Sequence, residues 1–231
     1  MAINLTTTAQ AASNGIKVLA HGPAGAGKTT ACSTTEAPTV IISAEAGLLS
    51  LRHLDIPVIE VANLSDVQEA YVFVQTSADA KDFEWVCLDS ISEIAEKVLS
   101  YEMAQTKDPR KAYGELQAQM MDLLRAFRDL PRNIYMSCKQ IREKDEGTGA
   151  TLYVPSMPGA KLGQQIPYLF DEVFALRVEK DQEGSVSRWF QTGRDLQYEA
   201  KDRSGALDLF EPVNLEHIAK KIHGDITSNA A

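Results

Sequence analysis

The sequence predicts a single α/β domain with a mostly parallel β-sheet, helices on both faces and antiparallel strands late in the chain. Short apolar runs typical of buried strands alternate with segments of helical periodicity, which is the pattern of a parallel sheet with helical crossovers. The chain has 231 residues, of which 44% are hydrophobic, enough for one sizeable core and little more. No internal repeat or low-complexity linker divides it.

The parallel strands are expected at apolar runs in the first part of the chain: Ile16–Ala20, Thr39–Ser43, Pro57–Val61, Trp85–Leu88 and Asn133–Cys138. Helices are expected between these runs. One begins near Lys28, and another is N-capped by Ser65 and runs to about Thr76. Two further segments, Ser92–Ala104 and Tyr113–Leu130, have the apolar spacing of helices that pack on a sheet.

The later part of the chain has a different pattern. Lys139–Gln165 is polar and contains glycines, so we expect a long loop, and such loops are usually functional or disordered. Glu172–Val178 and Ser187–Thr192 predict antiparallel strands around a turn at Asp181–Gly184. Asn214–Ile222 predicts a closing helix.

The predicted organisation is a flexible N-terminal arm at 1–14, one domain at 15–224 and a loose C-terminal tail at 225–231. No apolar run approaches the roughly 20 residues that span a bilayer, and the N-terminus lacks the basic and apolar regions of a signal peptide. The three cysteines form no C-x-x-C pair. This argues against a zinc site, and the odd count favours the reducing environment of the cytoplasm.

The charge of the chain is acidic overall, with a net charge of -9 and a pI near 5.0. This argues against a protein that coats nucleic acid through its overall charge. Residues 107–144 differ, because they contain nine Lys or Arg against five Asp or Glu. A local basic channel therefore remains compatible with the sequence.

The strongest motif is Gly22–Thr29, which matches G-x-x-x-x-G-K-[ST] at every fixed position, between an apolar strand and a helix. Glycines let the backbone wrap a phosphate, and successive N–H groups then face the anion. Lys28 neutralises charge on the β- and γ-phosphates, and Thr29 offers its hydroxyl to Mg²⁺. The alternative is a glycine-rich turn that binds nothing. We predict an ATP and Mg²⁺ site formed by Gly22, Pro23, Ala24, Gly25, Ala26, Gly27, Lys28, Thr29 and Thr30.

Two acidic residues at strand ends are candidates for this site. Asp89 ends the strand at 85–88, where a carboxylate beside the phosphate loop accepts from magnesium-bound water, so it joins Thr29 as a metal residue. The alternative for Asp89 is an ordinary helix cap. Hydrolysis also needs a group that orients and deprotonates water, and Glu45 follows a neighbouring strand. Glu93 is its rival, and on sequence pattern alone a solvent-exposed loop acid explains Glu45 better.

Several segments together resemble the core of RecA-type recombinases. Ile41–Ala46 resembles the RecA strand that ends in Ala-Glu and supplies the catalytic glutamate, which implies that role for Glu45. Val86–Ser90 resembles the RecA Walker B strand with its Asp-Ser ending. Ser137–Arg142 resembles the strand end that contains Gln-Ile-Arg, whose glutamine senses the γ-phosphate and reports to the following DNA-binding loop. The resemblance implies this catalytic role for Gln140.

The resemblance covers about Gly15 to Arg203, and the chain looks most like small phage ATPases that act in recombination or single-strand annealing. It implies a RecA-like P-loop NTPase fold and a DNA-stimulated ATPase in the cytoplasm of a bacterial host. It also implies a homo-oligomer with nucleotide at the subunit interface, and a single-strand-binding protein as a partner. Lys201–Gly205 resembles the Lys-Asn-Arg motif of RadA-like proteins, with Asp202 in place of Asn, which implies trans-acting roles for Lys201 and Arg203.

The residues themselves also favour single-stranded DNA as a ligand, because cations follow phosphates and an aromatic ring stacks on a base. The expected loop after Gln140 provides both kinds of side chain, and Lys107–Tyr113 provides a second segment of this kind. Before the resemblance is considered, a solvated loop explains the same charges equally well. The candidate DNA contacts are Lys107, Arg110, Lys111, Arg142, Lys144, Tyr153 and Lys161.

Two other functions remain open. An ATP-gated scaffold or loader would bind a protein partner and hydrolyse ATP slowly. A small-molecule P-loop kinase would share the phosphate loop and the chain length, but it would need an arginine-rich lid and an acceptor pocket. The strand end at Gln140 and the hairpin near residues 173–192 argue against the kinase.

Overall fold

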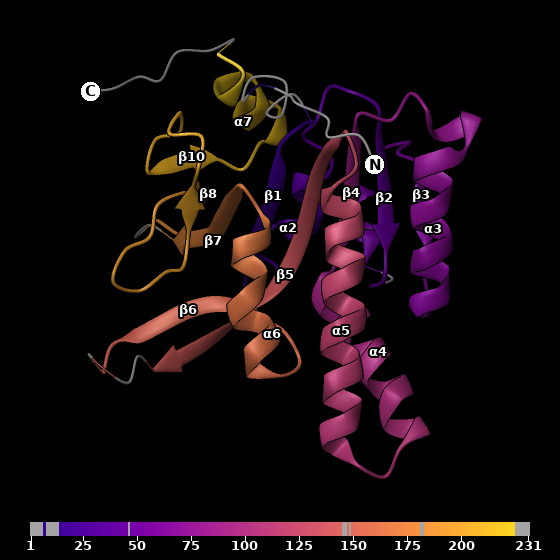
Figure 1. Cartoon of the computed structure of the whole chain (residues 1–231). Coiled ribbons are helices and arrows are strands. Elements are labelled where there is room, and N and C mark those ends of the chain that lie inside the picture. The colour runs from indigo at the N-terminus through magenta and orange to yellow at the C-terminus, as the bar shows by residue number, and fades with distance from the viewer. Residues whose placement is uncertain are drawn as a thin grey trace.

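The computed structural model describes residues 7, 14–45, 47–144, 147, 149–180 and 183–224, without the side chain of Ala160. In this part of the chain one sheet has the strand order β10-β8-β7-β1-β5-β4-β2-β3, with β6 paired to β5 and β9 paired to β7 (Figure 1). The strands from β3 to β7 along this order pair in parallel, whereas β6, β8, β9 and β10 pair antiparallel. The predicted fold class is therefore confirmed.

The strands are β1 (Lys17–Gly22), β2 (Thr39–Ser43), β3 (Val58–Glu60), β4 (Trp85–Asp89), β5 (Asn133–Lys144), β6 (Thr151–Ser156), β7 (Glu172–Lys180), β8 (Val186–Gln191), β9 (Lys201–Asp202) and β10 (Phe210–Pro212). The α-helices are α2 (Lys28–Ala31), α3 (Leu64–Thr76), α4 (Ile91–Gln105), α5 (Pro109–Arg128), α6 (Ala160–Gln165) and α7 (Leu215–Ile222). Short 3-10 helices occur at Leu48–Leu51, Ala78–Ala80 and Ile166–Leu169.

The sheet buries a different core on each face because successive side chains of a strand point to opposite sides. Val86 and Leu88 of β4 pack in the core beneath α3, α4 and α5, and Figure 1 shows α4 and α5 side by side. Trp85 and Cys87, one residue out of phase, pack in the core beneath α2 and α7. Both faces of β4 are therefore covered, as its continuous apolar run predicts.

The segment Lys139–Gln165 corrects the prediction of a long loop. Strand β5 continues to Lys144, well past the parallel sheet, and pairs antiparallel with β6 in a projecting hairpin (Figure 1). Pro155 fits in β6 because an edge strand leaves some N–H positions unpaired. Helix α6 then occupies the last part of the segment. The charged residues of the hairpin hid its strand periodicity, because no residue of β5 from Lys139 to Lys144 is buried.

Helix boundaries differ from expectation at two places. Asn63, not Ser65, caps α3, and its side chain accepts from Asp66 N at 3.1 Å while the Asp66 carboxylate accepts from Asn63 N. This reciprocal capping box satisfies two free N–H groups at once. Helix α5 begins at Pro109 after an Asp108 cap, so the basic segment at 107–113 starts a helix.

Some predictions concern residues outside the described part of the chain. These are almost all of the predicted arm at 1–14, the tail at 225–231, and two positions, 181 and 182, of the predicted β7–β8 turn. Gly184 has a positive φ of 88°, a conformation that suits glycine in such a turn.

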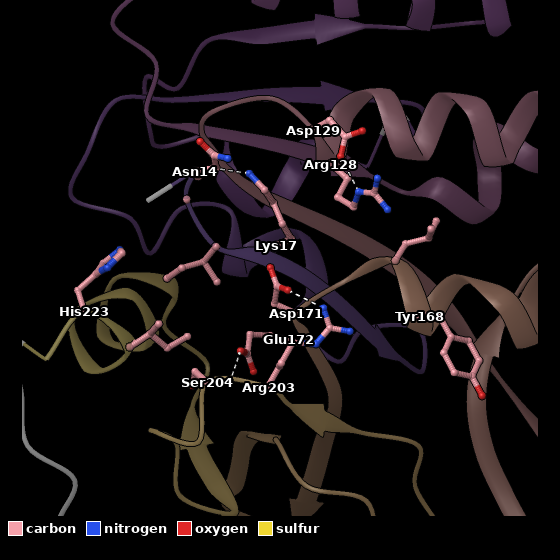
Figure 2. A pocket seen from close by; sticks show the side chains of 14 residues that line it. Asn14, Lys17, Arg128, Asp129, Tyr168, Asp171, Glu172, Arg203, Ser204 and His223 are labelled. Atoms are coloured by element: carbon pink, nitrogen blue, oxygen red, sulfur yellow. Dashed lines mark hydrogen bonds and ion pairs between the residues drawn. The ribbon is translucent and has the colours of Figure 1, made fainter. Parts of the chain in front are cut away.

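A cavity of about 740 Å³ lies where β1 and β7 begin, at the edge of the sheet opposite the carboxyl end of β1 (Figure 2). Lys17 donates to three backbone carbonyls, and Asp171 pairs with Arg203 at 2.9 Å. Glu172 is 1% exposed, accepts from Ser204 N through Oε1, and has no described partner for Oε2. Burial, reinforced by the nearby Asp202 carboxylate, raises the pKa of Glu172 to about 8.

This pKa predicts that Glu172→Gln stabilises the protein in a pH-dependent way. Between pH 4.5, the usual pKa, and pH 8 the folded state holds more protons at this group than the unfolded state. The stability of the native protein therefore falls as pH rises through this window. Relative to wild type, we expect the variant to gain stability from pH 4.5 upward, by roughly 1 kcal/mol or more at pH 8.

Urea unfolding of wild type and Glu172→Gln at several pH values from 4.5 to 9 measures this difference. Glu115→Gln serves as the control because Glu115 is an exposed carboxylate on α5. If the free energies of unfolding of wild type and Glu172→Gln differ by a constant amount from pH 4.5 to pH 8, Glu172 does not have a raised pKa in the folded protein.

Candidate functional site

The glycine motif forms the turn between β1 and α2, at the carboxyl end of the sheet. Gly22 ends β1, and a Cβ on it would lie 3.0 Å from Leu176 Cβ, so the close packing of β7 excludes a side chain. Gly27 caps α2 with φ of 109°, in the left-handed region that other residues rarely adopt. Residues 23–27 therefore bend tightly and direct the chain into a helix N-terminus, as a phosphate site requires.

Lys28 lies folded against this loop. Its Nζ donates to the carbonyls of Gly22 at 3.0 Å and Pro23 at 2.9 Å. Burial lowers the pKa of Lys28, and the carboxylates of Asp89 and Glu45 oppose that effect. The ammonium group is therefore held at the centre of the loop by backbone oxygens. The two acidic side chains are near enough to raise its pKa and so to favour its charged form.

Thr29 and Asp89 meet at the end of β4. The Thr29 hydroxyl donates to Asp89 Oδ2 at 2.6 Å, and the Ser137 hydroxyl donates to Oδ1 of the same carboxylate. Asp89 is 2% exposed. A hydroxyl and a carboxylate are hard oxygen ligands of the kind that Mg²⁺ prefers, so these residues fit that ion. Sequence reasoning missed Ser137, which becomes a neighbour only because β5 pairs with β4.

Glu45 lies just after β2, in contact with the residue that follows Asp89. The Ser90 hydroxyl donates to Glu45 Oε1, and the Ser90 side chain also accepts from Glu93 N at 3.3 Å to cap α4. Glu45 is therefore oriented by the residue that follows Asp89. Glu93, the alternative candidate from the sequence, instead forms an ion pair with Lys139, with Nζ and Oε2 3.1 Å apart.

Gln140 lies where β5 leaves the parallel sheet, and its side-chain oxygen is buried without a partner among the described residues. The neighbouring His21 is fully buried, and its Nε2 donates to the Glu199 carbonyl at 2.7 Å. Burial lowers the pKa of His21 to about 4, while the hydrogen bond to Glu199 and the contact with Gln140 oppose the shift. The ring is therefore neutral at physiological pH, and sequence reasoning did not identify it.

A model of the AAA domain family matches residues 14–204, which is most of the chain. The chain belongs to this family. Its members are AAA-type P-loop ATPases, in agreement with a glycine loop that adjoins a Thr–Asp pair at the end of a parallel strand. No curated protein matches the chain. Among the described residues, no helix is long and apolar enough to cross a membrane.

The candidate DNA residues of this AAA domain divide between two surfaces. Arg110 at the start of α5 and Lys161 on α6 line one groove of about 590 Å³, together with Tyr113. The two basic segments, far apart in sequence, therefore meet there. Arg142 and Tyr153 line a separate cavity of about 320 Å³ beside the phosphate loop, which is also lined by residues 23 and 140 and is called the second cavity below. The remaining candidates are exposed and line neither cavity: Lys107, Lys111 and Lys144.

The second cavity of the AAA domain contains an ordered stack of side chains. The rings of Tyr153 and Tyr198 are stacked, with centroids 4.6 Å apart and planes 11° apart. Arg142 lies over the Tyr153 ring at 5.2 Å, and Arg177 lies over the Tyr198 ring at 4.0 Å. The stack connects the β5–β6 hairpin to β7 and to Tyr198, and the next residue, Glu199, accepts from His21.

Lys201 and Arg203, the predicted trans-acting residues, have partners within the AAA domain itself. Lys201 Nζ donates to the carbonyls of Pro167 at 2.7 Å and Phe170 at 2.6 Å, and burial lowers its pKa. Arg203 pairs with Asp171 in the cavity of Figure 2. A role at a neighbouring nucleotide would require each cation to exchange these partners.

Proposed function

We propose that the chain binds Mg-ATP and hydrolyses it, and that single-stranded DNA stimulates the reaction during phage recombination or strand annealing in a bacterial cytoplasm. The observation that carries the ATPase part is the hydrogen bond from Thr29 to Asp89, beside Glu45. This bond joins the phosphate loop to the strand-end carboxylate of Asp89, and the next residue, Ser90, donates to the second acid, Glu45. A glycine turn without a nucleotide role would not need either acid.

The chain's own residues account for binding. The loop N–H groups and Lys28 hold the phosphates, and Thr29 and Asp89 supply oxygen ligands for Mg²⁺, with Thr30 following in the first turn of α2. When bound, Mg²⁺ neutralises phosphate charge. A phosphate oxygen offers Lys28 Nζ a charged acceptor in place of the two neutral carbonyls that it now contacts.

Catalysis then depends on orientation of the attacking water. Glu45 accepts from Ser90, so one carboxylate oxygen is fixed and the other remains for a water proton. Gln140 offers an amide oxygen that lacks a partner among the described residues, at the point where β5 leaves the sheet. An amide there can contact the γ-phosphate region and move with the hairpin that follows.

Single-stranded DNA is proposed for the groove between α5 and α6. Arg110 and Lys161 place two cations beside Tyr113, whose side chain is 41% exposed, so phosphate and base contacts are available together. Arg142 and Tyr153 of the β5–β6 hairpin line the second cavity together with Pro23 of the phosphate loop. A DNA strand that continued from the α5–α6 groove onto the hairpin would therefore reach a cavity that adjoins the nucleotide site.

The first experiment measures ATP hydrolysis with and without single-stranded DNA. Stimulation by DNA supports the proposal as a whole. Hydrolysis that ignores DNA, in a protein that does not bind DNA, would remove the DNA role and leave a protein-binding ATPase. A homo-oligomer with Lys201 and Arg203 acting in trans, and a single-strand-binding protein as partner, belong to the same proposal and are tested by light scattering and pull-down in ATP.

The double variant Arg110→Ala/Lys161→Ala is expected to weaken binding of a labelled oligothymidylate by about tenfold at low salt. The slope of log affinity against log salt should fall by about 0.7 for each phosphate that the variant no longer neutralises. The control is Arg125→Ala/Lys81→Ala, which removes the same charge at exposed positions outside the groove. Equal decreases in affinity for the two double variants would indicate nonspecific charge rather than a groove.

A further inference from the structure

Strand β8 brings an arginine to the phosphate loop that the sequence motifs do not include. A Cβ built on Gly27 would lie 3.6 Å from Cδ and 3.9 Å from Nε of Arg188. Arg188 is 161 positions after Gly27 in the chain but lies in contact range of it. The residue that follows Gly27 is Lys28, so the guanidinium approaches the part of the loop where the phosphates are expected.

The register of the β7–β8 hairpin explains this position. Arg188 pairs with Val178 and Phe190 pairs with Leu176, so the two β8 side chains project on the same face. Phe190 and Leu176 belong to the core that also contains Ala26 of the loop. Arg188 is on the same face of β8 as Phe190 but outside that core, and it therefore lies next to Gly27, the residue after Ala26.

Arg188 also lacks the partners that occupy several other arginines. Among the described residues, Arg128, Arg177 and Arg203 each form an ion pair with a carboxylate, whereas Arg188 forms none. Its side chain is exposed, and within the described part of the chain no hydrogen bond or ring contact involves it. An unpaired guanidinium beside an anion site is available for a phosphate oxygen, and its planar fork suits that ligand.

We infer that Arg188 is a phosphate ligand of the bound nucleoside triphosphate, supplied by the same chain that supplies the glycine loop. This inference rests on the proposed ATP binding. The absence of a side chain at Gly27 leaves the guanidinium a direct approach to the loop. Nucleotide binding would then also draw the β7–β8 hairpin onto the site, because β8 bears Arg188.

Calorimetric titration with MgADP and with a non-hydrolysable Mg-ATP analogue tests the inference. Arg188→Ala should weaken binding of at least the triphosphate analogue by about tenfold. Arg188→Lys should recover part of the affinity because it keeps the charge but not the fork. Arg125→Ala, which removes an exposed arginine from α5, should bind like wild type.

Two results keep this inference separate from the ATPase proposal. If Lys28→Ala abolishes binding while Arg188→Ala binds both nucleotides within about twofold of wild type, the Arg188 inference is overturned and the nucleotide site stands. If Lys28→Ala binds normally, the proposed function itself fails. Thermal unfolding checks that each variant is folded, and Arg188→Lys provides the measurement if the alanine variant is not.

Discussion

Replacement of Lys28 by alanine is expected to abolish tight nucleotide binding and to lower ATP hydrolysis by at least about a thousandfold. The ammonium group is held at the loop centre by the carbonyls of Gly22 and Pro23. Its removal leaves the β- and γ-phosphates without their main protein cation. It also leaves two carbonyl oxygens facing the anion, which adds repulsion to the missing attraction.

Phosphate release and calorimetric titration with Mg-ATP measure the two parts of this effect. Lys28→Arg should not restore the rate, because the larger planar guanidinium does not fit a position where an ammonium contacts two carbonyls. Lys81→Ala, an exposed lysine outside the site, provides the control. An unchanged dissociation constant in Lys28→Ala would show that the glycine turn is not a phosphate site.

Glu45→Gln is expected to lower the hydrolysis rate about a hundredfold to ten-thousandfold while nucleotide affinity stays close to that of wild type. The amide keeps the shape of the carboxylate and can still accept from Ser90. It cannot accept a proton from water. The decrease should therefore fall on the catalytic rate and not on binding.

Glu93→Gln is the matched comparison for Glu45→Gln. Glu93 lies in the first turn of α4, which is capped by Ser90, the residue that donates to Glu45. The Glu93 carboxylate, however, pairs with Lys139. Single-turnover hydrolysis should be close to wild type in Glu93→Gln and nearly absent in Glu45→Gln. The reverse order would assign the base to Glu93 and would remove Glu45 from the mechanism.

The phosphate loop could be predicted from sequence because its function depends on residues adjacent in the chain. Glycines, lysine and threonine at fixed spacing specify a turn and a helix start, whatever the rest of the fold does. Asp89 could be predicted almost as directly, since an acid at the end of an apolar strand emerges at the carboxyl edge of a parallel sheet. The structure adds its hydrogen bond with Thr29.

The hairpin at β5–β6 could not be predicted in the same way. Apolar alternation marks a strand when one face is buried, but from Lys139 to Lys144 no residue of β5 is buried. The sequence pattern there is that of a polar loop. Backbone pairing with β6, which sequence composition does not report, makes it a strand.

Local sequence is enough to predict the α/β class, the phosphate loop and the position of Asp89 at a strand end, because these follow from residue spacing and from the alternation of apolar segments. The role predicted for Glu45 comes from the resemblance and not from spacing. Which distant residues meet at that loop depends on tertiary packing. Ser137 reaches Asp89 because β5 lies beside β4, and Arg188 reaches Gly27 because the β7–β8 hairpin folds back in one register. Strand order depends on the packing of both cores together, so no local pattern encodes it.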